Sequence, residues 1–120
     1  MFFNISNHQL LEWPKEQRGS ALKLGNGAVR EIPLSRVDTD TTTAEIIGSA
    51  KRISKMVPNG AIAMVVGEYS LVYSITKRLR ARGIRVVVPC HERLSKFELQ
   101  PDGSSVKTSV FVFEGWRDVE

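Results

Sequence analysis

The chain has 120 residues, of which 42% are hydrophobic and 25% are charged, a composition typical of one soluble globular domain. Its 17 basic and 13 acidic side chains give a formal net charge of +4, which is compatible with an anionic ligand such as a nucleotide but does not by itself indicate one. The apolar runs are too short to span a bilayer, there is no signal-peptide pattern, and the single cysteine cannot form an internal disulfide. We therefore expect a cytoplasmic protein with no membrane partner.

The first third of the chain predicts a strand, a helix and a second strand. Residues 1–6 are mostly apolar and predict a short buried strand. A helix is expected to open at Pro14, because proline suits the first helical position, and to end at the glycine-rich segment 25–27. Residues 28–34 predict the second strand, and Pro33 near its end places it at a sheet edge.

The middle of the chain repeats the alternation. Thr42 and Glu45 have the spacing of a capping box and predict a helix that breaks at residues 58–60. The continuous apolar run 61–66 is typical of a strand covered on both faces. A third helix is expected to follow this strand and to close at Gly83.

The C-terminal third predicts a fourth strand and a hairpin. Residues 84–88 are rich in β-branched side chains, and Pro89 is expected to stop the strand. Residues 96–100 and 106–113 flank the turn signal at 101–104, which indicates a β-hairpin.

Alternating strands and helices favour parallel pairing with helices on both faces of the sheet. We expect a single α/β domain over residues 1–120, with a three-layer, Rossmann-like, mostly parallel sheet of order 2-1-3-4 and a C-terminal β-hairpin. In this order the chain reverses direction between the first and third strands. Open sheets bind ligands at such a switch point, beyond the carboxyl ends of the strands.

Three polar segments are expected to meet at the switch point, and both histidines of the chain lie in them. The segments are Ser6, Asn7 and His8 after the first strand, Gly67, Glu68, Tyr69 and Ser70 after the third, and Cys90, His91, Glu92 and Arg93 after the fourth.

Several of these residues also have a purely structural interpretation. Ser6 and Asn7 can cap a turn, Glu68 is favoured by the positive end of the following helix, and Cys90 is of a type that usually packs inertly. Trp13 is expected to be a packing anchor. The sequence holds no P-loop, no dinucleotide-binding glycine motif and no zinc-ligand spacing, so we expect neither a cofactor nor a metal.

Five short segments carry a resemblance to a known family: residues 2–8 (FFNISNH), 13–17 (WPKEQ), 65–70 (VVGEYS), 83–88 (GIRVVV) and 91–93 (HER). They resemble small stand-alone CRISPR-associated Rossmann-fold (CARF-like) proteins, some of which are ring nucleases. The resemblance covers residues 1–94 and leaves out the hairpin.

The resemblance implies a homodimer with facing strand ends and a cyclic oligoadenylate second messenger lying across the dimer axis. It also implies cleavage without metal, in which a ribose 2′-hydroxyl attacks the neighbouring phosphodiester and leaves a 2′,3′-cyclic phosphate. His8 is then the best candidate for proton transfer, His91 is the second choice, and Arg93 would stabilise the charge on the phosphorane. The remaining candidates would hold the ligand: Ser6 and Asn7 at a phosphate, and Gly67, Glu68, Tyr69 and Ser70 around the adenine or ribose.

Three functions stay open from the sequence. The first is a ring nuclease of antiviral signalling, and the second is a sensor of the same ligand without catalysis. The third is a small dimeric interaction protein in which residues 110–113 pair with a partner. A long nucleic acid is not expected as a partner, because the basic clusters of the sequence lack interleaved aromatic residues.

Overall fold

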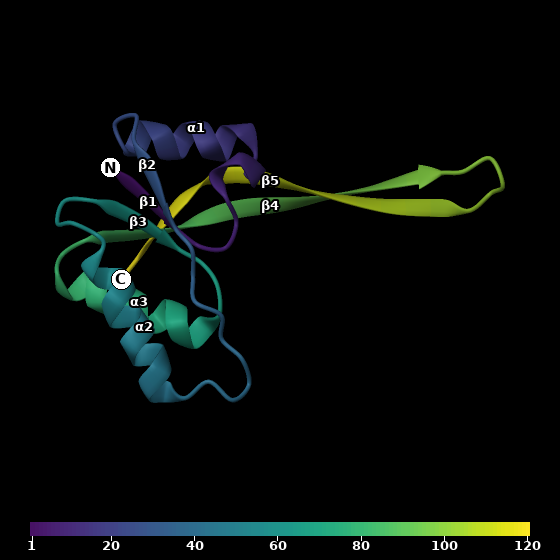
Figure 1. The fold of residues 1–120 in the computed structure, drawn as a ribbon. Helices are drawn as coiled ribbons and strands as arrows, with labels where there is room; N and C mark the ends of the chain where they lie inside the picture. Colours follow the sequence, from purple (N-terminus) through teal and green to yellow (C-terminus); the bar gives the residue numbers. More distant parts are fainter.

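The computed structural model describes residues 1–120 and shows an α/β fold built on a five-stranded mixed sheet (Figure 1). The strands are β1 (Phe2–Ile5), β2 (Val29–Ile32), β3 (Ile62–Val65), β4 (Arg85–Leu99) and β5 (Ser105–Val119). The helices are α1 (Lys15–Leu24), α2 (Thr43–Lys55) and α3 (Tyr69–Ala81), with a short 3₁₀ helix η1 (Leu10–Glu12) before α1.

The sheet order is β2-β1-β3-β4-β5, as predicted for the first four strands. These four strands are parallel, and β5 runs antiparallel to β4. The C-terminal hairpin is therefore part of the sheet, which is mixed. No helix is long and apolar enough to cross a membrane.

Helices cover both faces of the sheet, with α1 on one face and α2 and α3 on the other (Figure 1). Two separate clusters of buried side chains fill the two interfaces. Successive residues of β1 alternate between them, since Phe2 packs in the α1 cluster and Phe3 in the α2 and α3 cluster. Each face of the central strand is thus buried by a different helical layer.

The predicted start of α2 and the predicted turn after α1 are confirmed. The Glu45 N–H donates to Thr42 Oγ1 (3.1 Å) and the Thr42 N–H donates to Glu45 Oε1 (3.2 Å), so α2 starts with a complete capping box. Pro14 was expected at the first helical position of α1 but is its N-cap, because the helix begins one residue later at Lys15. After this helix the chain turns through left-handed backbone at Asn26 (φ 53°) and Gly27 (φ 87°).

The prediction that Pro89 stops the fourth strand is wrong, because β4 continues through it to Leu99. The last pair between β3 and β4 is Met64–Val87. Beyond it β4 keeps only β5 as a neighbour, and Pro89 lies opposite Trp116. A proline is tolerated there because one edge of the strand is free. The expected loop at residues 90–93 is consequently a strand.

Beyond the sheet β4 and β5 form a long two-stranded ribbon that projects from the body of the molecule (Figure 1). The predicted turn at its tip is confirmed, with Gly103 at φ 84° and the Ser104 N–H donating to Asp102 Oδ1 (2.9 Å). The radius of gyration is 17.5 Å, whereas a compact chain of this length has about 13.6 Å. The ribbon therefore gives the molecule its elongated shape.

Candidate functional site

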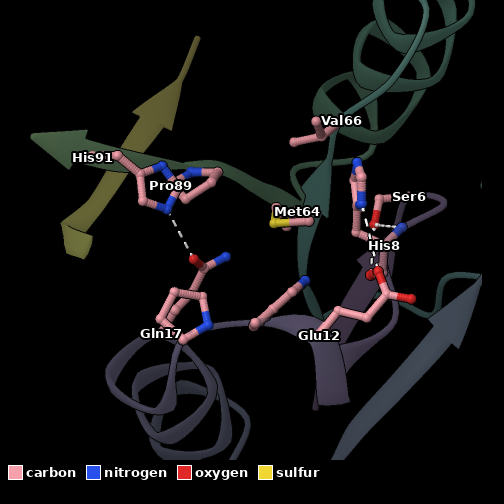
Figure 2. Close-up of a pocket in the computed structure, with 10 residues that line it drawn as sticks. Ser6, His8, Glu12, Gln17, Met64, Val66, Pro89 and His91 are labelled. Carbon is pink, nitrogen blue, oxygen red and sulfur yellow. Dashed lines mark hydrogen bonds and ion pairs between the residues drawn. The ribbon is translucent and has the colours of Figure 1, made fainter. Parts of the chain in front are cut away.

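Both histidines line one pocket of about 280 Å³ on the α1 side of the sheet. Figure 2 shows His8 beside Ser6 on one side of the pocket and His91 beside Pro89 on the other, with Met64 between them. The pocket lies where β1 and β3 end and where β4 separates from β3. Its lining residues are Ser6, His8, Glu12, Trp13, Pro14, Gln17, Met64, Val66, Pro89 and His91.

The His8 side is fixed by a buried polar pair at the end of β1. Asn4 is 1% exposed and Ser6 is 6% exposed, and Ser6 Oγ donates to Asn4 Oδ1 (2.6 Å). Asn4 Nδ2 donates to the His8 carbonyl (2.8 Å), and the His8 N–H donates to Ser6 Oγ (3.2 Å). The backbone of His8 is therefore held from two directions by side chains that the sheet itself positions.

The His8 imidazole has a carboxylate partner. Its Nδ1 atom lies 3.6 Å from Glu12 Oε2, and both side chains are exposed. The Nδ1 atom therefore faces a carboxylate, in an exposed pair of the kind that contributes little energy. Glu31 of β2 secures the same segment, because its Oε1 accepts hydrogen bonds from Leu10 N–H and from Asn4 Nδ2.

The His91 side is tied to α1. His91 Nε2 lies 3.0 Å from Oε1 of Gln17, and Gln17 is only 4% exposed. An amide oxygen can only accept a hydrogen bond, so with this amide orientation Nε2 of His91 carries the proton. The Nδ1 atom of the neutral imidazole then holds the free lone pair.

A β-bulge lies directly beside His91. The ladder pairs Cys90 with Gly115 and His91 with Phe113, so β5 has one extra residue, Glu114, at this point. The extra residue places Trp116 and Phe113 on the same face although they are three apart in sequence, and their rings are 5.1 Å apart. Bulges are common next to functional sites, where they re-aim side chains.

An aromatic cluster adjoins the pocket through Trp13. The ring centroid of Trp13 lies 6.3 Å from that of Phe2 and 6.1 Å from that of Trp116. The Trp116 Nε1–H donates to Ser20 Oγ (2.8 Å). Trp13 is buried, as expected for a packing anchor, and it also lines the pocket. Trp13 is the member of this cluster that lines the pocket, together with the apolar side chains of Met64 and Val66.

Asn7 and Gly67 pack against the chain that follows β2. Asn7 Oδ1 accepts a hydrogen bond from the Leu34 N–H (2.9 Å). A Cβ atom on Gly67 would lie 2.3 Å from Leu34 Cδ1, so the glycine allows this close approach of Leu34. Neither residue lines the pocket that contains the histidines.

The other candidates after β3 belong to the start of α3. Glu68 is the N-cap of this helix, and its Oε2 accepts from Ser70 Oγ (2.6 Å) and from the Leu71 N–H (3.0 Å). These hydrogen bonds hold the pKa of Glu68 below its ordinary value. Tyr69 is exposed and stacks on Tyr73 one turn later, with ring centroids 6.3 Å apart. The structure does not bring this group into the pocket of the histidines.

Arg93 lies on the ribbon, two residues beyond His91. Its guanidinium donates to Ser109 Oγ (3.2 Å) and lies 6.0 Å from the ring centroid of Phe111. It does not line the pocket, and the lining contains no lysine or arginine. Cys90 is half-buried within β4. No cluster of three or more His, Cys, Asp or Glu side chains could hold a metal ion.

Asn4, Glu12 and Gln17 were not among the predicted site residues, although signals for them existed. Asn4 is a polar residue in an apolar strand and shares a face with Ser6 by the two-residue period. Glu12 follows His8 by four residues, the spacing at which side chains meet on a helix. Gln17 gave no such signal, because its burial depends on the packing of α1 against β4 and β5.

The fold and the pocket together define an α/β protein with a two-histidine pocket at the carboxyl ends of its parallel strands. Residues 1–117 match the profile of the uncharacterized protein MJ1673 family, and the chain belongs to this family. No curated protein and no solved structure matches the chain significantly.

Proposed function

We propose that this chain is a ring nuclease that binds cyclic oligoadenylate and cleaves it without a metal ion. The observation that carries the proposal is the presence of both histidines of the chain in one pocket at the ends of β1 and β3. The choice of substrate rests on the resemblance to CARF-like proteins, whose motif segments 2–8, 13–17 and 91–93 contribute six of the ten lining residues.

Two imidazoles are sufficient for the reaction. One takes the proton of a ribose 2′-hydroxyl as its oxygen attacks the adjacent phosphorus. The bond from phosphorus to the 5′-oxygen breaks, and a protonated imidazole gives its proton to that oxygen. The products are a linear strand with a 2′,3′-cyclic phosphate at one end and a 5′-hydroxyl at the other.

The partners of the two imidazoles favour different roles. With the Gln17 amide oxygen facing Nε2 of His91, the tautomer that carries its proton on Nε2 makes the hydrogen bond, and its Nδ1 atom has the lone pair that a base needs. Glu12 Oε2 faces Nδ1 of His8, so Nε2 is the nitrogen of this imidazole that is available to a ligand. We therefore assign His91 as the base and His8 as the acid, which gives His91 a larger role than the sequence predicts for it.

The pocket is small for a whole cyclic oligoadenylate, which is why the proposal includes a dimer. About 280 Å³ is at the lower end of the range for small-molecule sites, so the pocket accommodates a single nucleotide and not a whole ring. In the proposed homodimer a second copy binds the other half of the ring across the two-fold axis. In this arrangement Ser6, whose hydroxyl proton is donated to Asn4, positions the backbone of His8 beside the ring. Asn7, Arg93 and the 67–70 segment contact parts of the ring that lie outside the pocket.

The proposal is tested by incubating the purified protein with cyclic tetra-adenylate or cyclic hexa-adenylate in EDTA and separating the products by chromatography. Linear products with a 2′,3′-cyclic phosphate support the nuclease. An intact ring that raises the melting temperature supports the non-catalytic sensor instead. An intact ring with no thermal shift contradicts both.

A further inference from the structure

The two faces of the β4–β5 ribbon differ in their chemistry. Directly opposed residues of antiparallel strands point to the same face, so the ladder register assigns every side chain to one of two faces. The aromatic face is defined by the pairs His91–Phe113, Arg93–Phe111, Ser95–Ser109, Phe97–Lys107 and Leu99–Ser105. The aliphatic face is defined by the pairs Glu92–Val112, Leu94–Val110, Lys96–Thr108 and Glu98–Val106.

Charge is segregated between these faces. The aromatic face carries Arg93 and Lys107 and contains no carboxylate. Both acidic residues of this part of the ribbon, Glu92 and Glu98, lie on the aliphatic face. The aromatic face therefore presents only positive charge to a ligand, whereas the aliphatic face presents both signs.

Each cation of the aromatic face sits over an exposed ring. The Arg93 guanidinium is 6.0 Å from the centroid of Phe111, and Lys107 Nζ is 5.9 Å from the centroid of Phe97. Phe111 is 62% exposed and Phe97 is 69% exposed. The aromatic face thus combines exposed rings with cations, a combination typical of surfaces that bind single-stranded nucleic acid.

We propose that the aromatic face of the ribbon binds single-stranded nucleic acid. The bases of an unpaired strand stack on Phe97 and Phe111, and its phosphates pair with Arg93 and Lys107. A duplex hides the faces of its bases and cannot stack in this way. The sequence alone argued against such a partner because its basic clusters lack aromatic neighbours, but the ladder brings Arg93 to Phe111 and Lys107 to Phe97 from opposite strands.

This binding surface does not depend on the proposed nuclease activity, although the two are contiguous. The aromatic face begins at His91, whose imidazole also lines the pocket. A strand bound along the ribbon would therefore lead into the pocket. A deoxyribose strand has no 2′-hydroxyl to attack its phosphates, so it tests binding separately from cleavage.

The test is fluorescence anisotropy with a labelled deoxyadenosine dodecamer, and with the corresponding duplex for comparison. The wild type is expected to bind the single strand in preference to the duplex. The double variant Phe97→Ala/Phe111→Ala is expected to raise the Kd by about tenfold or more, because two stacking rings are lost. The matched control Leu94→Ala/Val110→Ala removes exposed apolar side chains from the aliphatic face and is expected to leave the Kd within about twofold.

The contribution of Arg93 and Lys107 is measured separately, through the dependence of the Kd on salt concentration. Arg93→Gln/Lys107→Gln is expected to reduce the slope of log Kd against log salt by about 1.4, which corresponds to two phosphate contacts of a single strand. Lys96→Gln on the aliphatic face is expected to leave that slope unchanged. All the substituted side chains are exposed. Melting temperatures equal to that of the wild type verify that each variant is folded.

Three results would overturn the proposal. The first is a wild-type protein that binds neither single-stranded probe nor duplex at micromolar concentrations. The second is equal weakening by the variants of both faces. The third is an aromatic-face variant that retains binding but changes the oligomeric state in size-exclusion chromatography, which would identify this face as a contact with a second copy of the chain.

Discussion

His91 on β4 and Gln17 on α1 are joined through the 3.0 Å contact between Nε2 and Oε1, at the point where β4 leaves the sheet. They are 74 residues apart in sequence. The contact orients the imidazole of His91 against the buried face of α1. A buried residue of α1 thereby positions a side chain at the point where the two-stranded ribbon begins.

Replacing Gln17 with leucine is expected to slow ring cleavage by about tenfold to a hundredfold, because His91 loses the partner that orients it. Leucine has a similar size and suits a site that is 4% exposed, so the melting temperature is expected not to fall. The measurement is kcat and KM for cyclic tetra-adenylate. A positioning role lowers kcat with little change in KM, and an unchanged kcat would show that the contact has no part in the reaction.

The capping box of α2 gives a prediction about stability alone. Thr42→Ala removes the acceptor of the Glu45 N–H and is expected to lower the free energy of unfolding by about 1 kcal/mol. Thr42→Ser retains the hydroxyl and serves as the control. Urea unfolding of the three proteins measures the effect, and equal midpoints for Thr42→Ala and the wild type would contradict it.

The salt bridge between Arg85 and Asp118 predicts a dependence of stability on pH. Arg85 Nε donates to Asp118 Oδ1 (2.6 Å), and this hydrogen bond holds the pKa of Asp118 below its ordinary value. The folded state gains from the charged carboxylate above the ordinary pKa of about 4. The gain disappears as the pH falls through the lowered pKa, because the folded protein then takes up the proton as well.

The variant Asp118→Asn isolates this contribution. Its melting temperature is expected to lie slightly below that of the wild type near neutral pH, with the two values converging in acid below about pH 4. Both side chains of the pair are substantially exposed, so added salt is expected to shrink the difference. A difference that grows as the pH falls would contradict this interpretation of the pair.

Much of the fold was accessible from local signals. The strand order follows from alternating strand and helix patterns, and the start of α2 follows from Thr42 and Glu45, because these features depend on residues close in sequence. Pro89 misled the prediction for a physical reason. A proline stops a strand only where its missing N–H is needed, and β4 has already separated from β3 at that position.

The site was only partly predictable. His8 was found because it follows β1, and His91 because a strand end was expected just before it; β4 in fact continues through His91, but the structure still places both histidines in the same pocket. Gln17 was not predicted, because α1 is mostly polar and no neighbouring residue indicates that this glutamine is buried. The pairing of Arg93 with Phe111 was also hidden, because it depends on the register of two strands and on the bulge at His91.

Single-turnover cleavage of cyclic tetra-adenylate in EDTA by the wild type, His8→Ala, His91→Ala and the double variant tests the two-histidine site most directly. We expect each single variant to lose about 100-fold to 10,000-fold in rate while still binding the ring, as expected for a lost acid or base. The double variant is expected to be little slower than the slower single variant, because both groups act in one step. Full activity in either single variant, or a wild type that leaves the ring intact, would contradict the proposed role of the histidines.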